Sequence, residues 1–141
     1  MKRVKDMVAQ ANETVECITA RDAQDLLGRD GVVFIDLRDI RELHREGMIP
    51  GAFHCPRGML EFWIDPESPY AKPVFQGDHK FVFYCQSGWR SALSTLSAQD
   101  MGLGNVAHVV DGFSAWKDAG GPVAEKVEKR PGSADESKTP A

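Results

Sequence analysis

Residues 81–91 read FVFYCQSGWRS, and no other stretch indicates the fold class as directly. The first four residues form a continuous run of aromatic and β-branched side chains, which predicts a buried strand. The helix expected after the strand is capped by Ser91, runs to about Met101 and ends at Gly102. A buried strand followed within a few residues by a helix is the repeating unit of a parallel α/β sheet.

The same alternation extends in both directions from this stretch. Further strands are expected at 13–18, 32–35, 53–55 and 106–110, and helices at 3–13, 20–27, 36–46, 56–63 and 112–119. Residues 64–79 hold three prolines and one glycine, so this segment is expected to be irregular. The sequence therefore predicts an α/β fold with a mostly parallel central sheet of about five strands, flanked by helices on both faces.

Composition and charge narrow the function classes. Of 141 residues, 42% are apolar and 27% are charged, which is ordinary globular composition. The net charge of -4 argues against nucleic acid as a partner, because phosphate binding needs a basic surface. No run approaches about 18 apolar residues and no signal segment opens the chain, so no membrane partner is expected. Three cysteines, an odd number, favour free thiols in a cytoplasmic protein over a disulfide scaffold.

The chain is expected to divide into three segments. Residues 1–14 form an N-terminal helical extension, residues 15–124 form the α/β domain, and residues 125–141 form a disordered tail. The tail is rich in charge, serine and proline, and Val127 is its one apolar residue besides alanine. Such a segment cannot bury enough apolar surface to offset its ordering entropy.

The loop from Cys85 to Ser91 carries the chemistry that the sequence indicates. Ligand sites in open α/β sheets lie at the carboxyl ends of strands, where this loop is expected. The following helix N-terminus offers unpaired N–H groups and the positive end of a dipole, which stabilise a thiolate on Cys85. Arg90 adds a positive charge and a donor fork for an oxyanion, and Gly88 permits a backbone conformation that a Cβ atom forbids. The plainer alternative is a buried structural cysteine, with Arg90 as an ion-pair partner.

Three blocks of sequence stand out in order along the chain. The first is Ile35-Asp36-Leu37-Arg38, followed by Glu42 and by GMIPGA at 47–52; the second is CQSGWRS at 85–91; the third is DGFSAW at 111–116, followed by GGPV at 120–123. Together they resemble the signature of a single rhodanese domain, the sulfurtransferase family, over roughly residues 15–123. The resemblance implies a rhodanese-like fold for the α/β domain at 15–124.

The resemblance also implies a reaction. The Cys85 thiolate takes a sulfane sulfur from a small donor such as thiosulfate and holds it as a persulfide, and a thiol or cyanide acceptor then removes the outer sulfur. The loop that would hold the substrate and the persulfide comprises Gln86, Ser87, Gly88, Trp89, Arg90 and Ser91. Neither a metal nor an organic cofactor is expected. Cys17 and Cys55 are interpreted as packing residues.

The supporting residues have two interpretations. Asp36 either orients the loop, through Arg90 or through backbone N–H groups, or joins Arg38 and Glu42 in a structural ion-pair network that fixes the strand-to-helix turn. The network is favoured for Arg38 and Glu42. His108, in an expected strand, is interpreted as a satisfied structural histidine.

The segment between the first and second sequence blocks holds three candidates for a wall of the site. Arg57, Phe62 and Trp63 either wall the mouth of the site or belong to the core and a packed loop.

Two activities compete with small-molecule sulfur transfer. Phosphatases and arsenate reductases of similar fold carry H-C-x5-R, whereas four residues separate Cys85 from Arg90 and Tyr84 replaces the histidine, so both are disfavoured. The alternative that stays open is a non-turnover persulfide carrier, or a docking module in a sulfur relay with a protein partner.

Gln86 stands where family members that use thiosulfate often carry a basic residue, so thiosulfate is expected to be a poorer donor.

Overall fold

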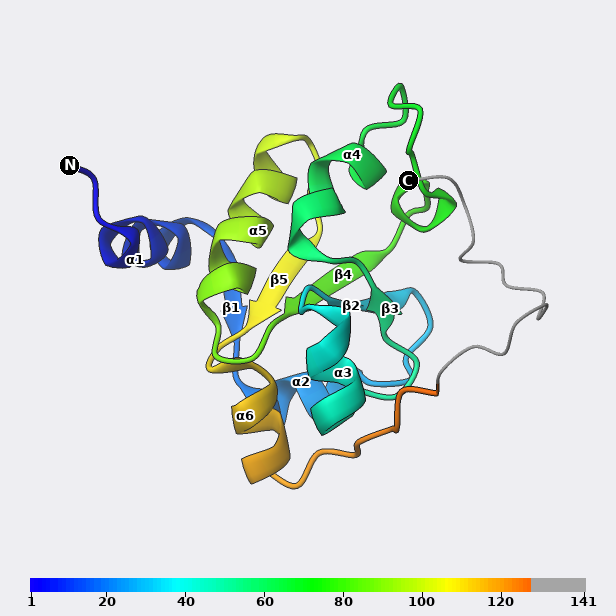
Figure 1. Cartoon of the computed structure of the whole chain (residues 1–141). Coiled ribbons are helices and arrows are strands. Elements are labelled where there is room, and N and C mark those ends of the chain that lie inside the picture. Colours follow the sequence, from blue (N-terminus) through cyan, green and yellow to red (C-terminus); the bar gives the residue numbers. More distant parts are fainter. Residues whose placement is uncertain (128–141) are drawn as a thin grey trace.

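The computed structural model describes residues 1–127, so the predicted tail at 125–141 lies almost wholly outside the described residues. One five-stranded sheet contains β1 (Glu16–Ile18), β2 (Val32–Asp36), β3 (Phe53–His54), β4 (Lys80–Tyr84) and β5 (Val106–Val109). The strands pair in parallel in the order β1-β5-β4-β2-β3 (Figure 1). The predicted α/β fold with a mostly parallel sheet of about five strands is confirmed.

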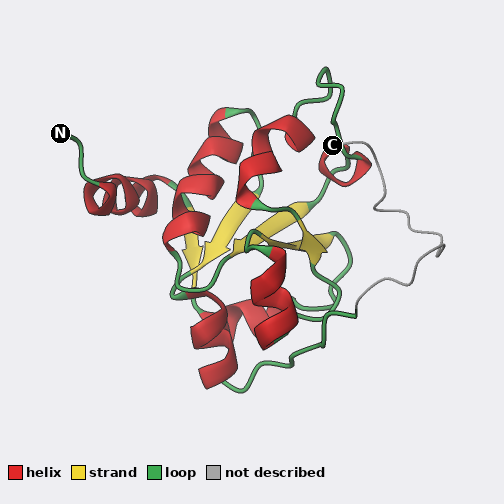
Figure 2. Cartoon of the chain, viewed as in Figure 1, coloured by secondary structure: helices red, strands yellow, loops and turns green. Residues whose placement is uncertain are grey.

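Helices cover both faces of this sheet (Figures 1 and 2). One face carries α4 (Leu60–Ile64) and α5 (Trp89–Asp100), and the other carries α2 (Ala20–Leu26), α3 (Ile40–Glu46) and α6 (Gly112–Asp118). The N-terminal helix α1 (Val4–Thr14) packs against α5. Within the expected irregular segment, Pro73–Gln76 forms a short 3-10 helix. Among residues 1–127, no helix is both long enough and apolar enough to cross a membrane.

Side-chain alternation along β4 divides the core into two layers. Phe81 and Phe83 pack on the side of α4 and α5, whereas Val82 and Tyr84 pack on the opposite side with Trp116 of α6. All five side chains are at most 2% exposed. Burying a phenylalanine stabilises the fold by about 1.5–3 kcal/mol relative to leaving it in water. The apolar run that identified this strand therefore also holds the sheet between its two helical layers.

Helix α3 begins later than the sequence predicts. Asp36 continues β2 instead of opening the helix, and Ile40 is the first helical residue. The carboxylate of Asp39 accepts the Arg41 N–H at 2.8 Å, and the Glu42 carboxylate accepts the Asp39 N–H at 2.9 Å. This reciprocal cap satisfies N–H groups that have no partner inside the helix, so it sets where the helix starts.

Helix α5 begins earlier than the sequence predicts. Trp89 is its first residue and Gly88 is its N-cap, with a left-handed φ of 101°. The prediction that Ser91 caps the helix is therefore wrong. Ser91 lies inside the first turn, fully buried, which leaves its hydroxyl free to bond groups of the loop and the sheet instead of the helix end.

Candidate active site

Cys85 follows β4, the central strand, and precedes the turn into α5. The residue is 1% exposed. Its Sγ accepts the backbone N–H of Gly88 at 3.1 Å and that of Ser91 at 3.4 Å. Both donors belong to the N-terminal end of a twelve-residue helix, where unpaired N–H groups and the helix dipole stabilise negative charge. The geometry around this sulfur therefore stabilises an anion.

Residues of the third sequence block pack against the backbone of this loop. The N–H of Phe113 donates to the Cys85 carbonyl at 2.8 Å. A Cβ atom on Gly112 would lie 2.5 Å from that same carbonyl oxygen, and one on Gly88 would lie 3.0 Å from the Asp111 nitrogen. Both glycines also have a positive φ. The loop and the start of α6 pack too closely to admit side chains at these two positions.

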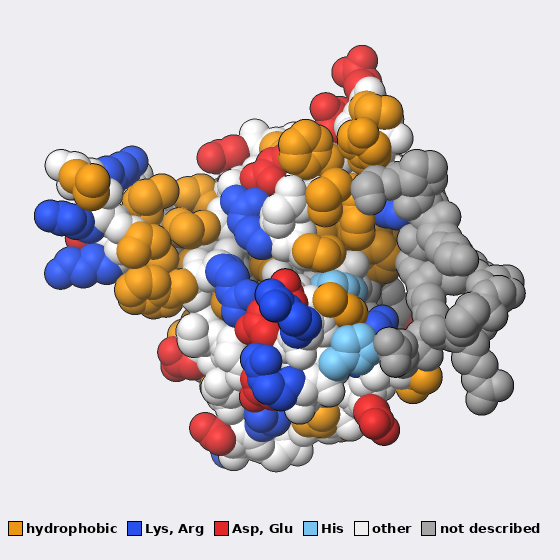
Figure 3. All heavy atoms as spheres, viewed as in Figure 1, with side chains coloured by type: hydrophobic (Ala, Val, Ile, Leu, Met, Phe, Trp, Pro, Cys, Tyr) orange, Lys and Arg blue, Asp and Glu red, His pale blue; other side chains and the backbone are white. Residues whose placement is uncertain are grey.

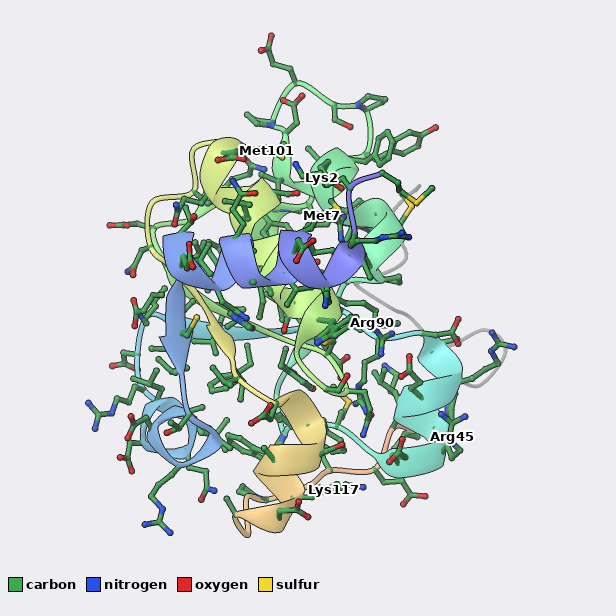
Figure 4. The ribbon with its side chains drawn as sticks, turned by 90° about the vertical axis from the view of Figure 1, so that its left-hand side faces the viewer. Lys2, Met7, Arg45, Arg90, Met101 and Lys117 are labelled. Atoms are coloured by element: carbon green, nitrogen blue, oxygen red, sulfur yellow. The ribbon has the colours of Figure 1, made fainter. Side chains whose placement is uncertain are left out.

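Arg90 contacts a carboxylate of the protein itself. Its two terminal nitrogens donate to the two oxygens of Glu42 at 2.8 and 2.9 Å. This bidentate bond lowers the pKa of Glu42. The sequence predicted a donor fork for an oxyanion, but the fork is engaged by α3. Figure 4 shows Arg90 between α5 and α3.

A second ion pair lies fully buried behind the loop. The side chains of Arg38 and Asp36 are both 0% exposed, and their closest contact is 2.8 Å. Arg38 also donates to the carbonyl of Gly47 at 2.7 Å and to the side-chain oxygen of Gln86 at 3.0 Å. Asp36 thus reaches the loop through Arg38 and not through Arg90. Asp36, Arg38 and Glu42 therefore do not form the single ion-pair network that was predicted. Asp36 and Arg38 form a buried pair, and Glu42 forms a separate, half-exposed pair with Arg90.

A chain of polar contacts runs from Cys85 across the sheet to α1. The Ser91 oxygen lies 3.6 Å from Cys85 Sγ and 2.9 Å from Nδ1 of His108. The other ring nitrogen of His108, Nε2, lies 2.7 Å from the side-chain oxygen of Asn12. Burial lowers the pKa of His108 to about 4. Sequence reasoning missed this chain because 96 residues separate His108 from Asn12; its one local signal is a polar residue inside an apolar strand.

The other two cysteines differ from each other. Cys55 is buried, and burial raises the pKa of its thiol to about 12, which agrees with a packing residue. Cys17 is exposed, so the prediction that it is a packing residue is wrong. Its Sγ lies 3.5 Å from Nε2 of His108. Within residues 1–127, no cluster of three potential metal ligands is present.

The three predicted wall residues do not share one surface. Trp63 lines a cleft of about 540 Å³ whose other lining residues are Ile40, His44, Ala52, Phe53, His54, Pro56, Lys72, Lys126 and Val127. Arg57 and Phe62 are not among them. Arg57 pairs with Glu61 at 3.0 Å, and the exposed ring of Phe62 packs against Tyr70.

Charges around the loop are balanced. Figure 3 shows acidic and basic side chains interleaved over this face of the molecule. Besides the Arg90 pair, Lys117 of α6 contacts Glu46 of α3 at 3.2 Å. Within the loop, Ser87 and Trp89 are exposed, and the neutral side chain of Gln86 bonds Ser114 at 3.0 Å. A ligand at this mouth meets paired charges and backbone dipoles.

Comparison with known proteins gives a family and several relatives. The family model described as the rhodanese-like domain matches residues 19–119. The chain is 27% identical over 106 residues to the thiosulfate sulfurtransferase GlpE of Actinobacillus succinogenes, covering 75% of this chain and 87% of that protein.

Two solved structures share the fold. A human single-domain sulfurtransferase has a TM-score of 0.61 and 24% identity, over 74% of this chain and 96% of the other. A Rhodopseudomonas palustris protein of unknown function, described as a possible tyrosine phosphatase, has a TM-score of 0.86 and 57% identity, over 88% of this chain and 96% of the other.

Proposed function

Because the chain belongs to the rhodanese-like domain family, we propose that it is a sulfurtransferase and that Cys85 carries the transferred sulfur as a persulfide. The observation that carries this proposal is the position of Cys85 Sγ, which receives N–H groups from Gly88 and Ser91 at the N-terminus of α5. An oxyanion hole stabilises charge in the same way, with fixed donors aimed at the atom that becomes anionic.

Sulfur transfer proceeds in two displacement steps. The Cys85 thiolate attacks the outer sulfur of the donor, a new S–S bond forms, and the leaving group (sulfite, for thiosulfate) departs with the electrons of the broken bond. An acceptor thiolate or cyanide then attacks the outer sulfur of the persulfide, and the Cys85 thiolate is restored. The loop N–H groups hold the anionic sulfur before and after each step. The reaction as proposed uses no metal and no organic cofactor.

The side chain after the nucleophile bears on the choice of donor. Gln86 is neutral, and Arg38 and Ser114 hold its amide at 3.0 Å on each side. The side chain of Gln86 adds no positive charge for the sulfonate oxygens of a dianionic donor such as thiosulfate. We therefore propose that the protein takes sulfur from a persulfide donor faster than from thiosulfate.

Phosphatase activity is the second candidate, because the Rhodopseudomonas palustris relative carries that description. A phosphatase of this type needs an arginine fork for the phosphate oxygens. Both terminal nitrogens of Arg90 bind Glu42 instead, and four residues separate Cys85 from Arg90. The geometry favours transfer of a single sulfur atom.

Intact-mass analysis tests the proposal directly. The protein is incubated with thiosulfate or with a small-molecule persulfide and then with cyanide, and parallel samples receive p-nitrophenyl phosphate. We expect the mass of one sulfur to appear and then disappear in the wild type and in Cys17→Ser, but not in Cys85→Ser. Sulfur that loads but leaves slowly with every small acceptor identifies a carrier. No sulfur uptake from either donor overturns the proposal, and turnover of the phosphate ester in its place establishes the phosphatase.

A further inference from the structure

The polar chain behind the nucleophile ends on a helix outside the matched family region. Asn12 belongs to α1, whereas the family model begins at residue 19. α1 is held in place by packing of Val8 and Ala11 against Ala92 of α5. Figure 4 shows α1 crossing over α5. The N-terminal helix thus brings the side-chain oxygen of Asn12 within 2.7 Å of His108.

The chemistry of the groups fixes the direction of each hydrogen bond. An amide oxygen can only accept, so Nε2 of His108 carries the proton that is donated to Asn12. Burial keeps the ring neutral above a pKa of about 4, so it holds one proton and Nδ1 is an acceptor. The Ser91 hydroxyl has two acceptors within reach, Nδ1 at 2.9 Å and the Gly88 carbonyl at 3.3 Å, and it donates its only proton over the shorter contact, to Nδ1. The Ser91 oxygen then faces Cys85 Sγ, 3.6 Å away, with lone pairs and not with a proton.

We propose that Asn12 and His108 are positioning residues that direct the Ser91 hydroxyl proton away from the sulfur of Cys85. The anionic sulfur is then held by the two backbone N–H groups and lacks a third, hydroxyl donor. A thiolate loses nucleophilicity as it becomes more stabilised, so withholding this donor keeps Cys85 reactive. The value of this arrangement for sulfur transfer rests on the proposed function, but the arrangement itself does not.

The ionisable side chains next to these polar contacts do not interfere with the pH profile of Cys85 reactivity. Arg90 lies near Cys85, and its bond to Glu42 raises its pKa, so the guanidinium stays charged. Cys17, next to His108, has its pKa raised above 9.0 by burial and by the charge of Glu16. A change in Cys85 reactivity below that pH therefore reports on Cys85 itself and on the Ser91 proton.

The first test is the pH profile of Cys85 alkylation in Asn12→Leu. Without the Asn12 oxygen, the Cys17 thiol, 3.5 Å from Nε2, becomes the partner of that nitrogen and donates to it. The ring then takes the other tautomer, and its Nδ1–H releases the Ser91 proton to the two remaining acceptors, the Cys85 sulfur at 3.6 Å and the Gly88 carbonyl at 3.3 Å. We expect the midpoint of iodoacetamide alkylation to fall by about one pH unit, read on the tryptic peptide 81–90. An unchanged midpoint overturns the proposal.

Two controls separate positioning from loosening of α1. Gln10→Leu makes the same kind of change on α1 at a side chain without a hydrogen bond to any described residue, and it should leave the midpoint unchanged. In a Ser91→Ala background, Asn12→Leu should no longer shift the midpoint, because the proton that it redirects is gone. A shift of equal size in that background shows a merely structural effect and overturns the proposal.

The tautomer of His108 gives an independent readout. Nitrogen-15 chemical shifts of the imidazole distinguish Nε2–H from Nδ1–H, and we expect Nε2–H in the wild type and Nδ1–H in Asn12→Leu. A wild-type ring protonated on Nδ1 overturns the proposal. Neither readout involves sulfur transfer, so a protein that shows these shifts but takes up no sulfur contradicts the proposed function alone.

Discussion

Replacing Arg38 by methionine tests how much the buried ion pair behind the loop stabilises the fold. Arg38 and Asp36 are fully buried, and Arg38 also holds the carbonyl of Gly47 and the side chain of Gln86. Removing one partner of a buried pair leaves the other charge uncompensated, which costs about 3–5 kcal/mol of unfolding free energy. Methionine fills irregular space well, so most of the loss reflects charge and hydrogen bonds and not a cavity.

Urea unfolding followed by tryptophan fluorescence measures this loss, and the chain offers a matched control. Arg41 pairs with Asp39 at 2.9 Å across the same sequence separation, but the two side chains are 84% and 48% exposed. Arg41→Met should therefore cost much less unfolding free energy than Arg38→Met, because solvent screens an exposed pair. Equal losses for Arg38→Met and Arg41→Met would refute the reasoning from burial. Adding Asp36→Asn to Arg38→Met should recover part of the loss, because the stranded charge is removed.

Three further predictions concern the turn at Gly88, the Arg90–Glu42 pair and the buried thiol of Cys55. Gly88→Ala should destabilise the protein by about 1–2 kcal/mol in urea unfolding, because a left-handed φ of 101° disfavours a Cβ; a neutral effect would contradict the loop geometry. Arg90 lowers the pKa of Glu42 in the folded protein. Glu42→Gln should therefore lose stability above the unfolded pKa of about 4.3, and this loss should vanish as the pH falls through the lowered folded-state pKa. Urea unfolding of both proteins from pH 7 to 3 measures the difference. Cys55, with a thiol pKa raised to about 12, should resist iodoacetamide at pH 8 in the native state and react in urea, as peptide mapping would show.

The strands were predictable because an apolar run is a local signal. Phe81 to Tyr84 read as a buried strand from four residues, and the sheet pairs these residues as expected of a central strand. Helix starts were less predictable, because several residues near each start can act as a cap. Ser91 has the chemistry of a cap, but the turn at Gly88 starts α5 three residues earlier. The serine hydroxyl is used by the site instead.

The partners of the site residues could not be read from the sequence. The sequence places Arg90 close to Cys85, but the carboxylate that binds its side chain belongs to Glu42, 48 residues away on α3. The ring of His108 is bonded from both ends, as the structural interpretation held, but its partners are 17 and 96 residues distant. Long-range pairing depends on strand order, and strand order is a property of the whole sheet and not of any segment.

The pairing of both arginines bears on what this site selects. Glu42 and Asp36 pair with Arg90 and Arg38, and the hydrogen bonds that Cys85 Sγ accepts come from the backbone N–H groups of Gly88 and Ser91. Fixed dipoles at a helix N-terminus stabilise anionic atoms, and a free arginine fork would add strength and specificity for the several oxygens of a phosphate dianion. The chain as a whole is also acidic, with a net charge of -4. These features favour a ligand whose charge gathers on one sulfur over one that brings several anionic oxygens.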